Sequence, residues 1–250
     1  AQHNDEQMII LVCNSSQALD NELVDSIKEE IPNVVSIVQN INQKKTNVIL
    51  GEKQIVLYGH DYYQDNIFDL KFKISSKSFF QVNSDQTEVL YKTALDFANI
   101  QKSDVVLDAY SGIGTISLMM AREAKHVYGV EIVKDAVIMA KENAKLNDLD
   151  NVSFVEDKAE DFIRKYVKEK SLDVLLVDPP RKGLHQDFIE SVIESKVNRF
   201  VYVSCNPKTL VRDLSLLKEH YQVEKVQCVD MFPQTLHVES VALLQRKSNK

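Results

Sequence analysis

The sequence predicts an α/β fold: a mainly parallel seven-stranded sheet with an antiparallel last strand, preceded by a small α+β subdomain. From about residue 83 onward, short apolar runs alternate with amphipathic helical patterns. These runs are continuously apolar, which is typical of strands covered on both faces by helices. Only the segment 230–237 separates the last two runs, and it is too short for a helical crossover, so we expect these strands to pair antiparallel. We therefore divide the chain of 250 residues into a subdomain at 1–75 and a larger domain at 76–250.

The subdomain begins with an apolar run at 8–13, which predicts a buried strand. A helix is expected at 20–29, where Asp20 or Asn21 suits the N-cap and apolar residues follow at helical spacing. Runs rich in Val, Ile and Phe, separated by Asn, Lys, Gly and Asp, predict further strands at 34–41, 46–50, 54–58 and 66–74.

The larger domain opens with a helix expected at about 84–98. Strands and helices then alternate. The strands are expected at about 104–109, 126–131, 151–155, 172–177, 198–203, 221–229 and 238–245, and the helices at about 114–124, 133–147, 157–169, 185–195 and 207–218.

Composition excludes several classes of protein. The hydrophobic share is 44% and the charged share 27%, which is an ordinary globular balance. No run approaches the roughly 20 apolar residues that span a bilayer, and the N-terminus lacks the features of a secretory signal. The net charge of −7 does not by itself suggest a nucleic-acid binder, but the acid excess lies mainly in the first 75 residues. The later part can therefore still present a basic face.

Three cysteines occur, and their wide spacing fits no zinc site, iron–sulfur cluster or small disulfide framework. Cys13 and Cys228 lie inside apolar strand patterns, where a cysteine usually serves as a small core residue. We therefore expect a reduced, cytoplasmic protein that binds neither a metal nor a membrane.

The first strand of the larger domain ends in a glycine-containing loop. Residues 108–115 read Asp-Ala-Tyr-Ser-Gly-Ile-Gly-Thr, and such glycines let a backbone approach a ligand at a helix N-terminus. A dinucleotide fingerprint needs a third glycine, where this chain has Ser117. Glu131 ends the second strand and Asp157 follows the third, so they are placed to accept from ribose hydroxyls and from an adenine amino group. The alternative is an ordinary strand–loop–helix turn with surface acids.

A proline turn follows the fourth strand. It reads Asp178-Pro179-Pro180-Arg181-Lys182-Gly183, and the two prolines fix the backbone and remove two donors. A rigid turn of this kind can hold Asp178 and the neighbouring carbonyls beside a planar substrate. The turn marks a site without naming the target atom.

Cys205 follows the fifth strand and opens a helix. The positive end of that helix dipole favours a thiolate, which makes Cys205 a candidate nucleophile. The alternative is a small core residue. Glu239 stands at the start of the last apolar run, where burial would raise its pKa toward the range of a general base. We assign His237 a structural or substrate-positioning role ahead of a catalytic one.

These motifs together resemble one family. The segments at 79–83 (Phe-Phe-Gln-Val-Asn), 108–114, 178–183, 204–207 and 237–239 occur in the order seen in the RNA 5-methyluridine (uracil-C5) methyltransferases. The likeness is to the bacterial 23S ribosomal RNA branch and covers about 75–246, while the front segment resembles that family's middle domain. Neither the family's N-terminal β-barrel RNA-binding module nor a cysteine set for an iron–sulfur cluster is found in this sequence.

The resemblance implies a Rossmann-like class I methyltransferase fold, S-adenosylmethionine as cofactor, and RNA, specifically 23S rRNA, as partner. It implies that Cys205 is the nucleophile and Glu239 the base. The cofactor set that we predict from the motifs and the resemblance together comprises Gln81, Asp108, Tyr110, Gly112, Gly114, Glu131, Asp157 and Asp178.

The implied chemistry needs one thiol and one carboxylate and no metal. Addition of the thiolate at C6 of uracil pushes electron density onto C5, which then accepts the methyl group, and a base removes the C5 proton. Cytosine-C5 enzymes of RNA often carry a second cysteine in the proline turn, and its absence here favours uracil. The target base must leave its stack, so a single-stranded or loop substrate is expected.

Four residues around the loops are candidates for RNA phosphates, with Asp178, or Gln81 with backbone amides, as reader of the uracil edge. The four are Arg181, Lys182, Lys208 and Arg212, and the alternative is that they are solvated surface charges.

Three other functions stay open. One is a cofactor-binding fragment that is silent without an RNA-binding module, and another is a tRNA uridine-C5 methyltransferase. The third is a methyltransferase of small molecules or proteins on the same fold. Cys205 and Glu239 argue against the third, because methylation of oxygen or nitrogen needs no thiol nucleophile. No oligomeric state is predicted.

Overall fold

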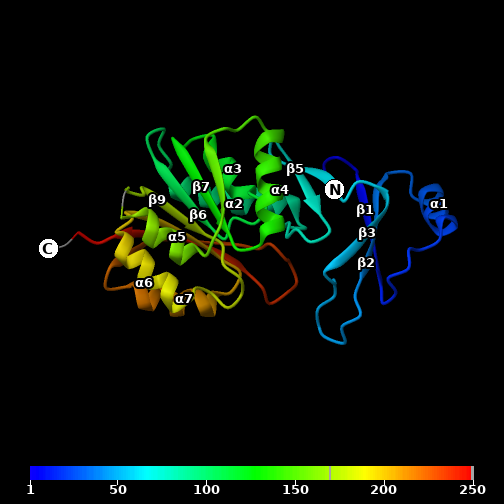
Figure 1. Ribbon diagram of the computed structural model, residues 1–250. Helices are drawn as coiled ribbons and strands as arrows, with labels where there is room; N and C mark the ends of the chain where they lie inside the picture. Colours follow the sequence, from blue (N-terminus) through cyan, green and yellow to red (C-terminus); the bar gives the residue numbers. More distant parts are fainter. Residues whose placement is uncertain (169, 249–250) are drawn as a thin grey trace. The chain divides into compact units, whose positions relative to one another are not determined.

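The chain folds into two compact units, Ala1–Phe80 and Gln81–Lys250, which are described separately. The structure is a computed structural model that describes residues 1–168 and 170–248 (Figure 1). The boundary between the units lies a few residues beyond the expected one, because the segment that follows the last strand of the first unit also belongs to that unit.

The first unit contains a three-stranded sheet in the order β1-β2-β3. β1 (Gln7–Cys13) pairs parallel with β2 (Val34–Ile41), which pairs antiparallel with β3 (Lys53–Gly59). Helix α1 (Asn21–Glu30) connects β1 to β2 and begins at Asp20, whose carboxylate accepts from the Glu22 amide at 3.2 Å, as the N-cap prediction required. The helix packs on the sheet through Val24 and Ile27 and closes a small core.

Two strand predictions in this unit are wrong. Residues 46–50 form part of the β2–β3 connection, where the Asn42 side chain donates to the carbonyls of Val48 and Ile49. Val48 and Ile49 are 60% and 75% exposed, so this apolar run has no core to join. The expected strand at 66–74 is instead parts of β4 (Tyr62–Ile67) and β5 (Leu70–Ser75), which form an antiparallel hairpin. The chain reverses at Phe68, whose φ of 52° is left-handed.

The second unit is built on a seven-stranded sheet in the order β11-β12-β10-β9-β6-β7-β8. Five strands are parallel: β6 (Val105–Ala109), β7 (His126–Glu131), β8 (Val152–Glu156), β9 (Val174–Val177) and β10 (Arg199–Ser204). β12 (Glu239–Arg246) pairs antiparallel with both β10 and β11 (Tyr221–Val229). The expected fold, with its antiparallel end, is confirmed.

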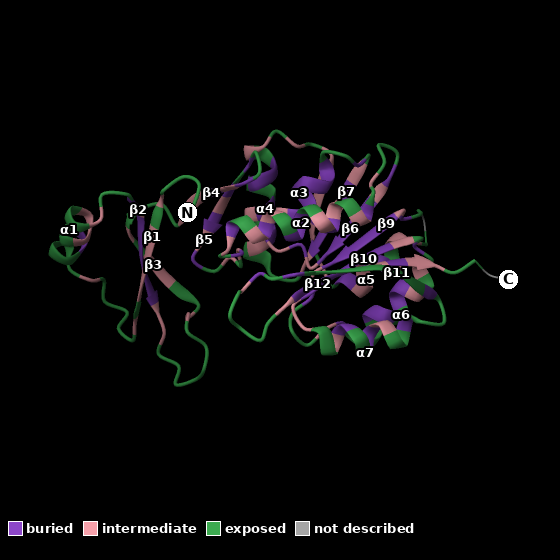
Figure 2. Ribbon diagram, turned by 180° about the vertical axis from the view of Figure 1, so that it is seen from behind, coloured by how far each residue is buried: buried purple, intermediate pink, exposed green. Residues whose placement is uncertain are grey.

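Helices cover both faces of this sheet (Figure 1). One group comprises α2 (Ser84–Ala98), α3 (Thr115–Ala121) and α4 (Lys134–Leu146), and the other comprises α5 (Ala159–Tyr166), α6 (Gln186–Ser195) and α7 (Pro207–Leu217). The central strands are buried between the groups, as Figure 2 shows, and all four residues of β9 are buried. This double cover explains the continuously apolar strands of the sequence. Helix α5 ends before 169, a residue of the predicted helix that lies outside the described residues.

The parallel strands point the same way, so the loops after their carboxyl ends meet at one edge of the sheet. That edge carries the glycine loop after β6, Glu131 and Asp157 after β7 and β8, Asp178 after β9, and Cys205 after β10. In the described part of the chain, no helix is both long and apolar enough to cross a membrane. Among those same residues, no group of three or more His, Cys, Asp or Glu is placed to hold a metal ion.

Candidate active site

A cavity of about 490 Å³ opens beyond the ends of β7 and β8. Three residues of the predicted cofactor set line it: Tyr110, Glu131 and Asp157. Sequence reasoning missed other lining residues, among them the apolar Ile132 and Ala159, because no motif distinguishes them from ordinary loop positions. The volume lies within the range of pockets that take small organic ligands.

Glu131 ties the glycine loop to the start of α4. One of its carboxylate oxygens accepts from the amides of Ile132 and Val133 at 2.8 and 2.9 Å, and the other accepts from the Gly112 amide at 3.2 Å. A carboxylate has about four acceptor positions, so these three bonds leave room for a ribose hydroxyl. A Cβ on Gly112 would meet no atom within 4 Å, so the backbone there is open to a ligand.

Asp108 lies beneath the loop rather than at the cavity wall. It is 2% exposed, and its carboxylate accepts from the Ser117 hydroxyl. Burial, with the charge of Glu131, raises its pKa to about 7. Ser117, which breaks the dinucleotide fingerprint, thus serves as a partner for Asp108. Gly114 lies at the N-cap of α3 and, like Asp108, does not line the cavity.

Of the other predicted cofactor residues, some line the cavity and some do not. Asp157 reaches the cavity, and its ion pair with Lys165 at 2.8 Å lowers the pKa of its carboxyl. Gln81 is buried just before α2 and is not a cavity residue. Two residues further on, Asn83 donates from its side chain to the Met231 carbonyl at 2.9 Å, which ties this segment to the loop that leads into β12.

Cys205, the residue after β10, lies near Glu239, the first residue of the neighbouring strand β12. The antiparallel register of β10 and β12 pairs Ser204 with Ser240, and the next residues toward the site edge are Cys205 and Glu239. Cys205 is half-buried, and Glu239 is 5% exposed. The implied chemistry requires these two groups to lie close together, although 33 residues separate them in the sequence. The β10–β12 pairing brings them close.

The charges around Cys205 act against its ionisation. Burial raises the pKa of its thiol, and the carboxylates of Glu239 and Asp178 raise it further, while Arg181 lowers it. This balance differs from the expectation of a thiolate favoured by the helix dipole, because two carboxylates face the sulfur. Burial also raises the pKa of Glu239, as its apolar sequence context predicted, with Arg181 again acting in the opposite direction.

Asp178 joins the same group of acids. Burial and the charges of Glu239 and Asp108 raise its pKa to about 8. Tyr91 of α2, which the sequence did not single out, lies 4% exposed beside them. Its pKa is raised by burial and by the charge of Asp178. An aromatic residue on an amphipathic helix carries no signal that separates this position from ordinary core.

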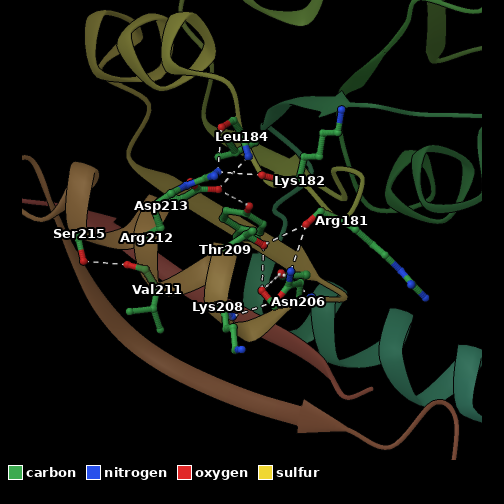
Figure 3. A network of polar contacts seen from close by, with 12 residues as sticks. Arg181, Lys182, Leu184, Asn206, Lys208, Thr209, Val211, Arg212, Asp213 and Ser215 are labelled. Carbon is green, nitrogen blue, oxygen red and sulfur yellow. Dashed lines mark hydrogen bonds and ion pairs between the residues drawn. The ribbon is translucent and has the colours of Figure 1, made fainter. Parts of the chain in front are cut away.

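The proline turn is fastened to helix α7 (Figure 3). Asn206 and Thr209 donate to the Arg181 carbonyl at 3.3 and 3.4 Å. Arg212 donates to the Lys182 carbonyl at 2.9 Å, so its guanidinium is engaged within the protein, a different use from the phosphate contact that we considered. The side chains of Arg181 and Lys182 extend away from this network. They and Lys208 are exposed and stay candidates for RNA contact.

The remaining cysteines lie outside this group. Cys13 is half-buried in β1 of the first unit. Cys228 is exposed, so its prediction as a core residue is wrong. β11 is the edge strand of the sheet, and seven of its nine residues are exposed, which the apolar pattern did not reveal. His237 is also exposed.

Comparison with known proteins confirms the predicted family of RNA uracil-C5 methyltransferases, and the branch of ribosomal RNA enzymes stays a prediction. The family described as tRNA (Uracil-5-)-methyltransferase matches residues 21–247. The chain belongs to this family. It is 52% identical over 244 residues to an uncharacterized RNA methyltransferase of Oceanobacillus iheyensis, covering 96% of this chain and 53% of that protein. An uncharacterized RNA methyltransferase of Enterococcus faecalis is 48% identical over 248 residues, covering 98% and 54%. This uracil-5-methyltransferase homologue thus spans about half the length of these relatives.

A solved structure with the same fold is the Pyrococcus abyssi tRNA (uracil-54, C5)-methyltransferase in complex with S-adenosyl-L-homocysteine. It matches with a TM-score of 0.75 and 30% identity, over 96% of this chain and 56% of that one. A putative SAM-dependent methyltransferase from Streptococcus mutans shares the fold at a TM-score of 0.65 and 14% identity.

S-adenosylmethionine is the cofactor of this family and fold, and the residues present fit it. Carboxylates at the ends of β7 and β8 would suit the ribose and the adenine amino group, and Ile132 and Ala159 would supply apolar walls for the adenine ring. The open backbone at Gly112 gives the ligand a close approach.

Proposed function

We propose that this methyltransferase homologue transfers a methyl group from S-adenosylmethionine to C5 of a uridine in RNA, with Cys205 as nucleophile and Glu239 as general base. The observation that supports the proposal is the β10–β12 register, whose last pair, Ser204 and Ser240, leaves Cys205 and Glu239 as the next residues at the sheet edge that carries the loops after the parallel strands. Chemistry on oxygen or nitrogen needs no such thiol.

In this reaction, the Cys205 sulfur adds to C6 of uracil as a thiolate, and the C5–C6 electron pair moves toward C5 and the O4 carbonyl. The bound cofactor would supply an electrophilic methyl group, and C5 would form its new bond to that carbon as the bond to the sulfonium sulfur breaks and leaves the thioether S-adenosyl-L-homocysteine. The Glu239 carboxylate then removes the C5 proton, and the electron pair of that C–H bond re-forms the double bond and expels the thiolate. The thiol proton is lost to solvent before the attack, and the proton taken by Glu239 passes to solvent afterwards, so both groups return to their starting state.

The surrounding acids suit this sequence of steps. The pKa of Glu239 is raised by burial, which makes its carboxylate a stronger base than an exposed one. Asp178, whose pKa of about 8 keeps it largely protonated at neutral pH, can donate a hydrogen bond to a uracil carbonyl. The pKa of Cys205 is raised by burial and by Glu239 and Asp178, and Arg181 only partly offsets this, so the thiolate that attacks is the minor form of this thiol at neutral pH.

We propose 23S rRNA as the substrate and the cytoplasm as the location. A tRNA substrate is the second candidate, because the family description and the Pyrococcus abyssi structure both refer to tRNA. A third outcome is a chain that binds the cofactor but transfers no methyl group alone, since it spans about half of its relatives.

The test is transfer of a tritiated methyl group from S-adenosylmethionine to 23S rRNA and tRNA transcripts, followed by mass-spectrometric mapping of 5-methyluridine. We expect Cys205→Ala to abolish transfer while cofactor binding persists in calorimetry. Cys228→Ala, which removes the exposed thiol of β11, is the matched control and should keep activity. Glu239→Gln should trap the covalent RNA adduct as a shifted band on a denaturing gel. Full activity of Cys205→Ala would end the proposal.

A further inference from the structure

A buried acid outside the proposed chemistry lies behind the proline turn. Asp213 of α7 is fully buried, with a side-chain exposure of 0%. Its carboxylate accepts from the Leu184 amide at 2.8 Å, the Tyr202 hydroxyl at 2.7 Å and Arg212 Nε at 2.8 Å. A buried carboxylate is costly unless it is paired and hydrogen-bonded, and this one is both.

Its partner Arg212 reaches across to the turn. The guanidinium pairs with Asp213 at 2.6 Å and also donates to the carbonyls of Lys182 and Leu184 at 2.9 and 3.2 Å. Together with Asn206 and Thr209 on the Arg181 carbonyl, helix α7 therefore holds three carbonyls and one amide of residues 181–184 (Figure 3).

The contact is also tight in space. Gly183 has a φ of 75°, and a Cβ there would lie 2.5 Å from Asp213 Oδ2 and 2.7 Å from Arg212 Nη2. The turn therefore sits directly against the Arg212–Asp213 pair with no room for a side chain between them.

The proposed nucleophile lies directly before the same helix. Cys205 immediately precedes Asn206, the N-cap of α7, and Asn206 bonds through its side chain to both the Lys208 amide and the Arg181 carbonyl. The turn that begins at Asp178 and the residue that follows Cys205 are thus joined by one hydrogen-bonded network through the Arg181 carbonyl. We propose that Asp213 and Arg212 are positioning residues, which hold the turn at 178–184 in a fixed place relative to Cys205. This proposal rests on the proposed function, because the position of the turn affects kcat only if the methyl transfer takes place at this site.

Two readouts separate positioning from mere stability. The first is kcat against KM, because a displaced turn lowers kcat at the reaction site, whereas Tyr110, Glu131 and Asp157 of the cavity lie on other loops and only His185 adjoins the turn. The second needs no activity: the carbonyls of Arg181 and Lys182 belong to the bonds that trypsin cleaves, and both are bound by α7. The rate of cleavage at these bonds reports local opening of the turn. Cleavage after Lys44 or Lys45, in the β2–β3 connection of the same chain, gives the reference rate.

The matched pair of variants is Tyr202→Phe and Tyr221→Phe in the full chain. Both remove one buried phenol hydroxyl from the same core, but Tyr202 donates to Asp213, whereas Tyr221 donates to the Val197 carbonyl at 2.9 Å. Both should lower the melting temperature by similar amounts. Only Tyr202→Phe should speed trypsin cleavage after 181 or 182 and lower kcat.

Asp213→Asn should have the larger effect, a fall in kcat of about tenfold to a hundredfold, with KM for S-adenosylmethionine changed less than about twofold. Should Asp213→Asn fail to fold, Tyr202→Phe and Arg212→Lys carry the test. Equal cleavage rates and equal kcat for the two tyrosine variants would overturn the proposal. If the wild-type chain transfers no methyl group, the proposed function fails, whereas trypsin cleavage still decides whether the pair holds the turn.

Discussion

Replacing Gly183 by alanine should destabilise the larger unit through two separate costs. A left-handed φ costs a non-glycine residue about 1–2 kcal/mol. The new Cβ would lie 2.5 Å from Asp213 Oδ2 and 2.7 Å from Arg212 Nη2, and overpacking of this kind typically costs about 1–3 kcal/mol. Together these make about 3 kcal/mol, and since 1 kcal/mol shifts the melting temperature of a domain of this size by about 2–4 °C, we expect a fall of roughly 6–12 °C.

Gly112→Ala is the matched control for the first cost. Gly112 has a φ of 55°, but a Cβ there would meet nothing within 4 Å, so only the conformational penalty applies. Differential scanning calorimetry of both variants, followed at the transition of the larger unit, should therefore show a smaller shift for Gly112→Ala. Equal shifts would refute the reasoning that the Arg212–Asp213 pair leaves no space at Gly183.

Three further predictions concern ionisable groups that are buried or half-buried. Because the folded pKa of Asp178 is about 8 and its ordinary value is 3.8, the folded state holds a proton that the unfolded chain releases. Its contribution to the free energy of unfolding should thus fall as the pH rises from about 4 to 8. In urea denaturation, the free energy of unfolding of Asp178→Asn should therefore increase relative to that of the wild type over that range. A difference between the two free energies that does not change with pH would contradict this prediction. The raised pKa of Cys205 predicts slow alkylation by iodoacetamide at pH 7, with a rate that still climbs above pH 9, whereas a plateau below pH 8 would argue against the carboxylates' influence. Arg199→Ala should cost about 3–5 kcal/mol in denaturant unfolding, because it leaves Asp104, 6% exposed, without its ion-pair partner; the double variant with Asp104→Ala should lose less than Arg199→Ala.

The parallel part of the fold could be predicted because each strand is a continuous apolar run with a helix after it. That pattern reports burial on both faces, so β6, β9 and β10 are readable without any tertiary information. The run at 46–50 looked equally apolar and is a loop, since burial depends on a partner strand that local sequence does not reveal. The exposed Cys228 was misjudged for the same reason, because strand order decides which strand lies at the edge.

The site divides along similar lines. Glycines, prolines and a cysteine at strand ends mark loops whose chemistry is local, so Cys205, Glu131 and the turn at 178–183 could be found. Asp213 was missed, although a signal existed: it lies three residues after the buried Leu210 and four before the buried Leu217, so an acid occupies the apolar stripe of α7. What it bonds to could not be foreseen, because Tyr202 and Leu184 come from other elements.

The position of β12 carries a consequence for how the protein matures during synthesis. Its partners β10 and β11 both leave the ribosome before it does, and it must enter between them. Since Glu239 is the first residue of that inserted strand, a growing chain that already displays Cys205 still lacks the acid opposite. If the proposed function holds, the thiol therefore cannot act with Glu239 until β12 has paired with β10 and β11.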